Sequence, residues 1–512
     1  MKIRKIAIVG GGTAGWMTAN HLGVELCRDP DIEITLIESK DVPVIGVGEG
    51  TVPRIKETLK KFGISEVDLL SSCDTTFKTG IKFSNWMSGK SSAKGNYYYH
   101  PFSSPYPQGF DITDYWLQAE KASGFSRLSE IFSIAESDRC PKHKSSPPYV
   151  GAVDYAYHFN AGKFSDLIAS NAKSRFGVKH KFETVEDVRL NADGDIESLI
   201  YASGLEEAFD FYLDCSGFSA VLLGKALQTP YEDKSSQILT DTALVLQEPT
   251  SESSTIQPYT TAVAHKAGWI WDIPLTTRRG LGCVYSSAHL PEAEALGEFS
   301  SYLGRPLEMD DVRKIPMKIG YRRDFWKKNC VALGLSQGFV EPLEATSILV
   351  TDFSANLLAK SFPRFSQDIE VLSGYYNRSV KYTWDRVIDF VQLHYCISDR
   401  RDTDFWVDCT EGAPMSDVLE ERLERWSITT PKSSDFFSTF DIFGVENYLF
   451  VLYGMGYSTK SIVIGEKERV EAEKILRDLQ GRSERMAEEL IPHRSWLSEL
   501  QKQLSKMGAH SQ

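Results

Sequence analysis

The sequence lacks the features of several protein classes. Its 512 residues carry a net charge of −13, which argues against the basic surfaces that nucleic acid and anionic membranes select. No apolar run reaches the roughly 18 residues that a membrane span needs. The apolar stretch at the N-terminus is too short for a signal peptide and runs straight into glycines. We therefore expect a cytoplasmic protein with neither nucleic acid nor membrane as a partner.

Cysteine is scarce and shows no pattern. The eight cysteines include no Cys-x-x-Cys pair and no cluster with the spacing of zinc ligands. Free thiols in a reducing compartment and no metal site are the expectation. The composition, 42% hydrophobic and 25% charged, is ordinary for a globular chain, and the length alone suggests two to four domains.

A glycine-rich turn near the N-terminus has the full context of a dinucleotide site. Residues 3–9 predict a buried strand that ends in GGGTAG at 10–15, a helical pattern follows, and a second strand ends at Glu38. The glycines permit a tight turn and let the backbone approach a pyrophosphate at the helix N-terminus. Glu38 is placed to accept hydrogen bonds from the ribose hydroxyls of the adenosine.

A second glycine cluster, GVGEGT at 46–51, follows closely. It is either a flexible turn or a segment whose small residues lie along a flavin. The pairs Gly280–Gly282 and Gly454–Gly456 both lack the third glycine of a dinucleotide motif. The chain thus has one such fingerprint, and if its ligand is FAD, no obvious site remains for NAD(P)H.

Three further stretches are candidates for chemistry. GWIWDIP at 268–274 places two indoles on one face of a strand that stops at Pro274, as a core strand or as a wall for a ligand. CDTTFKTGIKFSNW at 73–86 alternates as one strand, with Lys78 and Lys82 on a face that is usually solvated. If that face looks inward, Lys78 becomes a reactive amine or a strong hydrogen-bond donor.

The third stretch is GFVEPLEATSI at 338–348, which reads as a helix start. Proline and acidic residues are favoured in a first helical turn, so Glu341 and Glu344 have a purely structural explanation. In the functional alternative, the free N–H groups around residues 345–347 hold a small anion and Glu344 is a positioned carboxylate.

The remaining chain divides into strand-rich and helical parts. Residues 258–290 and 313–335 favour strands, and the chain from about residue 342 onward favours helices. A helical stripe at Leu476, Leu479, Met486 and Leu490 indicates packing, and residues 90–95 and 142–148 are expected to be loops.

Together these stretches resemble the flavin-dependent halogenases, the group that includes the tryptophan halogenases. The matching stretches are GGGTAGW at 10–16, TFKTGIKF at 76–83, YHPF at 99–102, GWIWDIP at 268–274, GFVEPLEATSI at 338–348 and DFVQLHYCISDRRDTDFW at 389–406. The resemblance implies that a separate NAD(P)H-dependent flavin reductase supplies reduced FAD. The reduced FAD and O2 together oxidise chloride or bromide to hypohalous acid, which passes through an internal tunnel to an aromatic substrate.

The resemblance also implies roles for individual residues. Lys78 would bind or carry the electrophilic halogen, and Glu344 would assist beside it, orienting the halogen or taking the proton from the ring. Thr346 and Ser347 would hold the halide, and His100 and Phe102 would line the substrate pocket. The residues expected at the cofactor are Gly10, Gly12, Thr13, Ala14, Gly15, Glu38, Gly48, Trp269, Trp271 and Gly334.

The match departs from tryptophan halogenases in the C-terminal region. There those enzymes clamp the amino acid with an aromatic pair, a glutamate and a Phe-Trp pair, whereas SDFFSTFDIFGVENYLFVLYG at 434–454 is shorter and lacks the tryptophan. Without that clamp the charges of free tryptophan are poorly paired. We therefore expect indole-type or other electron-rich aromatics to be preferred. Leu335 also stands where related flavoproteins often have Asp or Asn, after Gly334.

The expected fold is α/β, a Rossmann-like FAD-binding core of the flavin monooxygenase type with a mainly helical C-terminal region covering the substrate. The core is expected over residues 1–375, with inserted substrate-pocket segments at about 76–150, and the helical region over 376–512. A flavin monooxygenase, a free-tryptophan halogenase and a non-enzymatic flavoprotein are the rival interpretations, and a homodimer stays open.

Overall fold

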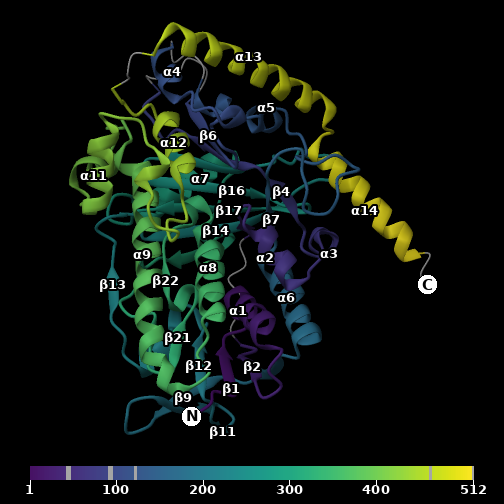
Figure 1. Ribbon diagram of the computed structural model, residues 1–512, viewed down its shortest axis with the longest axis vertical. Coiled ribbons are helices and arrows are strands. Elements are labelled where there is room, and N and C mark those ends of the chain that lie inside the picture. Colours follow the sequence, from purple (N-terminus) through teal and green to yellow (C-terminus); the bar gives the residue numbers. More distant parts are fainter. Residues whose placement is uncertain (42–47, 90–95, 120–123, 461–463, 510–512) are drawn as a thin grey trace.

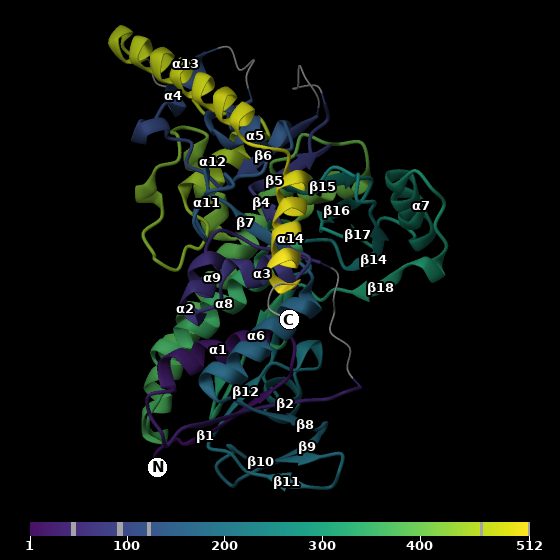
Figure 2. The ribbon, with the colours of Figure 1, turned by 90° about the vertical axis from the view of Figure 1, so that its right-hand side faces the viewer.

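The computed structural model of the protein describes residues 1–41, 48–89, 96–119, 124–460 and 464–509. Gly46 and Val47 of the second glycine cluster, and the loop expected at 90–95, lie outside these ranges. Figures 1 and 2 show the N-terminus at one end of the molecule and the helices near the C-terminus, apart from the last, gathered toward the other end.

A largely parallel sheet forms the N-terminal end of the molecule (Figure 1). Its six strands, in spatial order, are β20 (Trp326–Lys327), β21 (Cys330–Ala332), β12 (Phe211–Asp214), β1 (Lys5–Val9), β2 (Glu33–Glu38) and β8 (Lys179–Phe182), with only β20 antiparallel. Residues 6–9 are all buried, as expected for a parallel strand covered on both faces. The helices α1 (Thr13–Leu26), α6 (Ala161–Phe176) and α8 (Thr346–Lys360) pack together beside this sheet. The predicted α/β core is confirmed.

A second, larger sheet stands beyond the first and is mostly antiparallel. Its seven strands, in order, are β18 (Arg313–Pro316), β14 (Thr242–Pro249), β17 (Arg278–Tyr285), β16 (Gly268–Pro274), β15 (Thr260–His265), β5 (Gly80–Ser84) and β6 (Tyr97–Pro101). Only the β15–β5 pair is parallel. Every residue of β16 is buried, and the strand ends at Pro274 as the sequence predicts.

The stretch at 73–86 is not one strand, which corrects the sequence prediction. β4 (Thr76–Lys78) joins a small sheet with β3 (Glu49–Gly50) and β7 (Ala156–Phe159), whereas β5 belongs to the seven-stranded sheet. The chain changes sheets at Thr79, whose N–H donates to Pro258 O at 2.6 Å and whose carbonyl accepts from Phe102 N at 2.8 Å. A β-carbon on Gly80 would lie 2.4 Å from His100 O, so only glycine allows β6 to approach there.

Two other three-stranded sheets complete the β structure of the described ranges. One contains β9 (Val185–Leu190), β10 (Ile196–Tyr201) and β11 (Glu206–Glu207), and the other contains β13 (Tyr231–Asp233), β19 (Gly320–Arg322) and β22 (Gly338–Phe339). β22 leads into the helix start at α8, which brings that segment beside the larger sheet.

Helices make up most of the chain after residue 345, as the sequence predicts. They include α9 (Ile369–Cys396), α10 (Asp404–Val407), α11 (Asp417–Trp426), α12 (Val445–Gly454), α13 (Glu466–Glu489) and α14 (His493–Ala509). Before residue 345 the described chain also contains the helices α2 (Ile55–Phe62), α3 (Glu66–Ser72), α4 (Thr113–Gln118), α5 (Ile131–Glu136) and α7 (Glu292–Leu303). α9 runs unbroken through residues 375 and 376, where a domain boundary was expected. No helix in the described ranges is both long and apolar enough to cross a membrane.

Candidate functional site

In the glycine-rich turn between β1 and α1, packing leaves no room for a side chain at Gly10 or Gly15, whereas Gly12 faces open space. Gly10 has φ of 120°, and a β-carbon there would lie 2.1 Å from Cys215 O. At Gly15 a β-carbon would lie 1.9 Å from Gly10 O, because the helix packs against the strand. Gly12, the N-cap of α1, would place its β-carbon within 4 Å of nothing. The open side of Gly12 is therefore where a phosphate group can approach the backbone.

Glu38 ends β2 beside this turn, as the sequence predicts. Its carboxylate is so close to Gly11 that any side chain there would collide with it. His180 of β8 lies with Nε2 2.9 Å from Glu38 Oε1. Both side chains line a cavity together with Gly11, Trp16, Gly162, Ser165, Asp166, Ala169, Lys173 and Phe182. This cavity has the polar and aromatic walls that an adenosine needs, and His180 is a contact that the sequence did not reveal.

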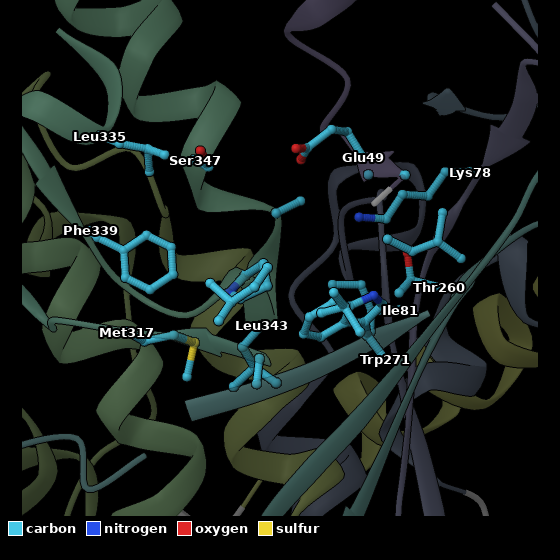
Figure 3. Close-up of a pocket in the computed structure, with 18 of the residues that line it drawn as sticks. Glu49, Lys78, Ile81, Thr260, Trp271, Met317, Leu335, Phe339, Leu343 and Ser347 are labelled. Atoms are coloured by element: carbon cyan, nitrogen blue, oxygen red, sulfur yellow. The ribbon is translucent and has the colours of Figure 1, made fainter. Parts of the chain in front are cut away.

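A second cavity, here called the central cavity, lies between the seven-stranded sheet and the segment that leads into α8 (Figure 3). Its empty space, open solvent included, is about 960 Å³. Its lining includes Gly48, Glu49, Gly50, Lys78, Ile81, Phe218, Thr260, Trp271, Leu335, Phe339, Leu343, Ala345 and Ser347. In Figure 3, Lys78 and Thr260 stand on one side, and Leu335, Phe339 and Ser347 stand on the facing side.

Lys78 is a fully buried amine without a hydrogen-bond partner in the described part of the chain. Burial lowers the pKa of Lys78 to about 7, against an opposing effect from Glu344. Its Nζ lies 5.2 Å from the centre of the Phe102 ring. Lys82 is only half-buried and pairs with Glu136 at 3.5 Å, so the two lysines differ in kind. The solvated face expected for this pair is therefore wrong for Lys78.

Glu344 is held between two histidines from different parts of the chain. His100 Nδ1 of β6 lies 2.9 Å from both carboxylate oxygens, and His394 Nε2 of α9 lies 2.9 Å from Oε1. Burial alone would raise the pKa of Glu344, but the two rings lower it to about 2. The carboxylate is therefore ionised at neutral pH. On its other side, His100 Nε2 lies 3.0 Å from Asn447 Oδ1 of α12, which ties the C-terminal region to this group.

The start of α8 presents unpaired donors to a small cavity. Pro342 to Glu344 form a 3-10 turn, and Ala345, with φ of 56°, turns the chain into α8 at Thr346. No side chain caps this end, so the first N–H groups of the helix lack intrahelical partners. The buried hydroxyl of Thr346 also has no hydrogen-bond partner in the described residues. The small cavity is lined by Gly334, Leu335, Gln337, Gly338, Phe339, Val340, Thr346, Ser347, Val350, Thr351 and Trp384.

Glu341 has different hydrogen-bond partners from Glu344. Glu341 accepts hydrogen bonds from Tyr395 at 2.6 Å and from Thr240, so the structural explanation suffices for it.

The two indoles of β16 are neighbours, with centroids 6.0 Å apart. Trp271 lines the central cavity and its N–H is buried without a partner in the described residues, whereas Trp269 lies behind it against Trp86.

The residues present fit FAD. Gly12 offers an open cradle for the pyrophosphate, Glu38 lies beside the adenosine cavity, and the central cavity has flat walls at Trp271 and Phe339. Four of the other expected cofactor residues lie at these features, whereas Trp269 lines none of the three cavities. Thr13 and Ala14 open α1, and Gly48, with φ of 98°, lines the central cavity. Gly334 would place a β-carbon 2.5 Å from Ala14 Cβ and lines the small cavity.

Comparison with known proteins identifies the family of the chain. The model of the tryptophan halogenase family matches residues 5–465. The chain belongs to the tryptophan halogenase family. It is 34% identical over 476 residues to tryptophan 6-halogenase SttH of Streptomyces toxytricini, covering 88% of this chain and 89% of that one.

Solved structures of flavin-dependent halogenases share the fold of the whole chain. A tryptophan halogenase from Shewanella frigidimarina superposes with a TM-score of 0.93 at 35% identity, covering 98% of both chains. BrvH, a flavin-dependent halogenase from Brevundimonas sp. BAL3, superposes with a TM-score of 0.86 at 31% identity, covering 98% of this chain and 99% of the other. This halogenase is therefore a flavin-dependent enzyme with the predicted fold.

Several residues at the site carried no recognisable role in the sequence. Glu49 belongs to the predicted glycine cluster but was not expected at the site. Asn447, Thr260 and Phe218 reach it from distant parts of the chain, and no local pattern marks them. Burial raises the pKa of Glu49 to about 7, which makes it a second group in the central cavity that titrates near neutrality.

Proposed function

We propose that this halogenase oxidises chloride or bromide and places the halogen on an electron-rich aromatic ring by way of Lys78. Lys78 is the observation that carries the proposal. It lines the central cavity, yet its amine also lies over the ring of Phe102, which belongs to the expected substrate side. A buried amine without a partner is thus shared between the cofactor side and the substrate side.

The cofactor and the start of α8 account for halide oxidation. Bound reduced FAD supplies two of the electrons that O2 takes up and the halide supplies the other two, which gives hypohalous acid and water. The unpaired Thr346 hydroxyl and the N–H groups around Ser347 hold the halide beside the central cavity. The absence of a second dinucleotide fingerprint supports delivery of reduced flavin by a separate NAD(P)H-dependent reductase.

Lys78 and Glu344 account for the transfer to the ring. The amine either donates a hydrogen bond to hypohalous acid or forms an N–halogen bond with it and releases water. Transfer then forms the carbon–halogen bond, breaks the bond from halogen to nitrogen or oxygen, and releases the ring proton. Glu344, ionised between His100 and His394, orients the halogen or takes that proton.

The substrate is best described as an indole-type compound without the charges of an amino acid. Two buried arginines of the C-terminal region are already paired, Arg422 with Asp441 at 3.2 Å and Arg386 with Asp389 at 2.7 Å. Neither arginine is therefore free to bind a carboxylate. Phe390 and Phe450 beside His100 offer apolar contacts instead.

Free tryptophan is the second candidate. The relatives SttH and tryptophan 7-halogenase RebH, the latter 34% identical over 486 residues, are named for that substrate. Glu446, in the first turn of α12 next to Asn447, has no ion-pair partner among the described residues and raises the pKa of Tyr106 electrostatically, after the larger effect of burial. Its carboxylate is the group that could pair with an ammonium.

The test supplies purified enzyme with FAD, an unrelated flavin reductase, NADH, O2 and bromide. Product formation is measured by mass spectrometry for indole, tryptamine and tryptophan, and kcat/KM is compared. We expect brominated products with indole ahead of tryptophan. Tryptophan ahead of indole, with that advantage lost in Glu446→Gln, would replace the indole proposal by the second candidate. An oxygenated product without bromine would contradict the halogenation itself.

A further inference from the structure

A chain of hydrogen bonds joins the end of β16 to the wall of the central cavity. The Thr76 hydroxyl lies 2.6 Å from Pro274 O and 3.1 Å from His158 Nδ1. His158 Nε2 in turn lies 2.8 Å from the hydroxyl of Thr260. Thr76 and His158 are fully buried and Thr260 nearly so. The chain ends at Thr260, which lines the central cavity on the same side as Lys78 (Figure 3).

The hydrogen bonds that link Thr76, His158 and Thr260 can have only one donor-to-acceptor direction. A carbonyl oxygen only accepts, so the single O–H of Thr76 donates to Pro274 O. His158 Nδ1 must then carry the proton that it donates to Thr76. Burial, and next the charge of Lys78, lower the pKa of His158 well below its ordinary value, so the ring is neutral and Nε2 is bare. Thr260 therefore donates its O–H to His158, and its oxygen keeps only acceptor positions.

The acceptor side of Thr260 and the amine of Lys78 lie close to one point. A β-carbon on Gly50 would lie 3.2 Å from Lys78 Nζ and 3.5 Å from Thr260 Oγ1. The amine has no partner in the described structure, and a buried donor without a partner is costly. Rotation about the lysine torsions would bring an N–H toward the hydroxyl oxygen of Thr260.

We propose that Thr260 is a positioning residue for Lys78, held as a pure hydrogen-bond acceptor by His158 and Thr76. An N–H donated to Thr260 fixes the rotation of the amine, so that its remaining positions face the halogen and the substrate. The inference rests on the role proposed above for Lys78. The direction of the whole hydrogen-bond chain is set at the end of GWIWDIP, where the backbone carbonyl of Pro274 accepts from Thr76.

The test measures how the oxidising equivalents divide between brominated product and free hypobromite. For each variant, brominated product and free hypobromite are counted per molecule of reduced FAD oxidised, along with FAD affinity and the KM for the aromatic substrate. Thr260→Val removes the hydroxyl at nearly constant shape, and Thr260→Ser keeps it. Thr76→Val breaks the far end of the chain, away from the cavity. Thr75→Val is the matched control, because Thr75 is equally buried but donates to Leu69 O outside the chain.

We expect Thr260→Val to bind FAD and substrate as the wild type does, while brominated product per flavin falls about tenfold and free hypobromite rises. Thr260→Ser should stay within about twofold of the wild type, Thr76→Val should lose in the same direction but less, and Thr75→Val should match the wild type. A wild-type yield in Thr260→Val, or an equal loss in Thr260→Ser, would overturn the inference.

Lys78→Ala, run in parallel, separates this inference from the proposed function. If it is inactive while Thr260→Val brominates normally, only the role of Thr260 fails. If Lys78→Ala itself still brominates the substrate, the role of Lys78 fails and the role of Thr260 fails with it.

Discussion

Lys78 and Phe102 face each other across 5.2 Å, measured from the amine to the centre of the ring. Phe102 is fixed from the same segment, since its N–H donates to the carbonyl of Thr79, the residue after Lys78. The amine and the ring are therefore positioned by consecutive residues. Under the proposed function, a halogen delivered at Lys78 would leave on the side where Phe102 would pack an aromatic substrate.

Replacing Lys78 by methionine should separate halogenation from flavin oxidation. Methionine keeps the apolar stem but removes the amine, so aryl halide formation should fall by at least about 100-fold while reduced FAD is still oxidised. Product and O2 consumption are measured together. Lys82→Met is the control, because Lys82 pairs with Glu136 and does not line the central cavity. Equal losses in both variants would mean that the region tolerates no change and that Lys78 has no special role.

The yield of halogenated product should depend on pH near neutrality. Lys78, whose pKa burial lowers to about 7, is protonated below that pH and neutral above it. An N–halogen bond needs the neutral amine, so product per flavin should rise between pH 6 and 8. A yield that falls over this range would favour a protonated lysine that only donates a hydrogen bond.

Glu49 is the control for that pH dependence, because burial raises its pKa to about 7 as well. Glu344 and His158, whose charges interact with that of Lys78, keep their own charge over this range. The pKa of Glu344 is lowered to about 2, and that of His158 lies well below its ordinary value. A rise that persists in Glu49→Gln belongs to Lys78, and a rise that disappears belongs to Glu49.

Thr346→Val should weaken halide binding alone. The buried hydroxyl of Thr346 has no partner in the described residues, so its removal costs no internal hydrogen bond but removes a donor from the small cavity. We expect the KM for bromide to rise about tenfold with little change in the KM for the aromatic substrate. Thr383 lies on α9 and donates a hydrogen bond to Phe440 O, so Thr383→Val controls for general destabilisation. An unchanged bromide KM would place the halide elsewhere.

The glycines of the nucleotide turn should respond differently to alanine. Gly12→Ala meets no atom within 4 Å, so the stability of the protein without FAD should fall by only about 1 kcal/mol, while FAD affinity drops at least tenfold. Gly10→Ala collides with Cys215 O at 2.1 Å and should cost about 3 kcal/mol or more. Thermal unfolding and flavin titration measure the two effects. Tight FAD binding by Gly12→Ala would argue against a pyrophosphate at this turn.

The nucleotide-binding part was predictable because its evidence is local. A strand, a glycine turn, a helix and Glu38 follow one another within 40 residues, and β1, α1 and β2 lie where that pattern puts them. The periodicity of GWIWDIP likewise gives the right strand and its end at Pro274. The family resemblance added the candidate roles of Lys78 and Glu344, which alternation and helix-start rules alone leave as ordinary.

The burial of Lys78 and the partners of Glu344 could not be predicted because they are non-local. Alternation over 73–86 continues across Thr79, so nothing in the pattern reveals that the chain changes sheets there. His100, His394 and Asn447 converge on Glu344 from segments as much as 347 residues apart. Pairwise contacts of this kind depend on how sheets and helices pack, which a single sequence does not encode in any window.

The change of sheet at Thr79 also bears on how the enzyme can be engineered. One residue joins the strand of Lys78 to the strand of Ile81, so an inserted or deleted residue would send one of these side chains to the opposite face of its sheet. Thr79 also positions Phe102, because the Thr79 carbonyl accepts a hydrogen bond from the Phe102 N–H. Grafts between relatives should therefore move residues 76–102 as one unit. Substrate range is better altered from α12, which reaches the site through Asn447 and Phe450.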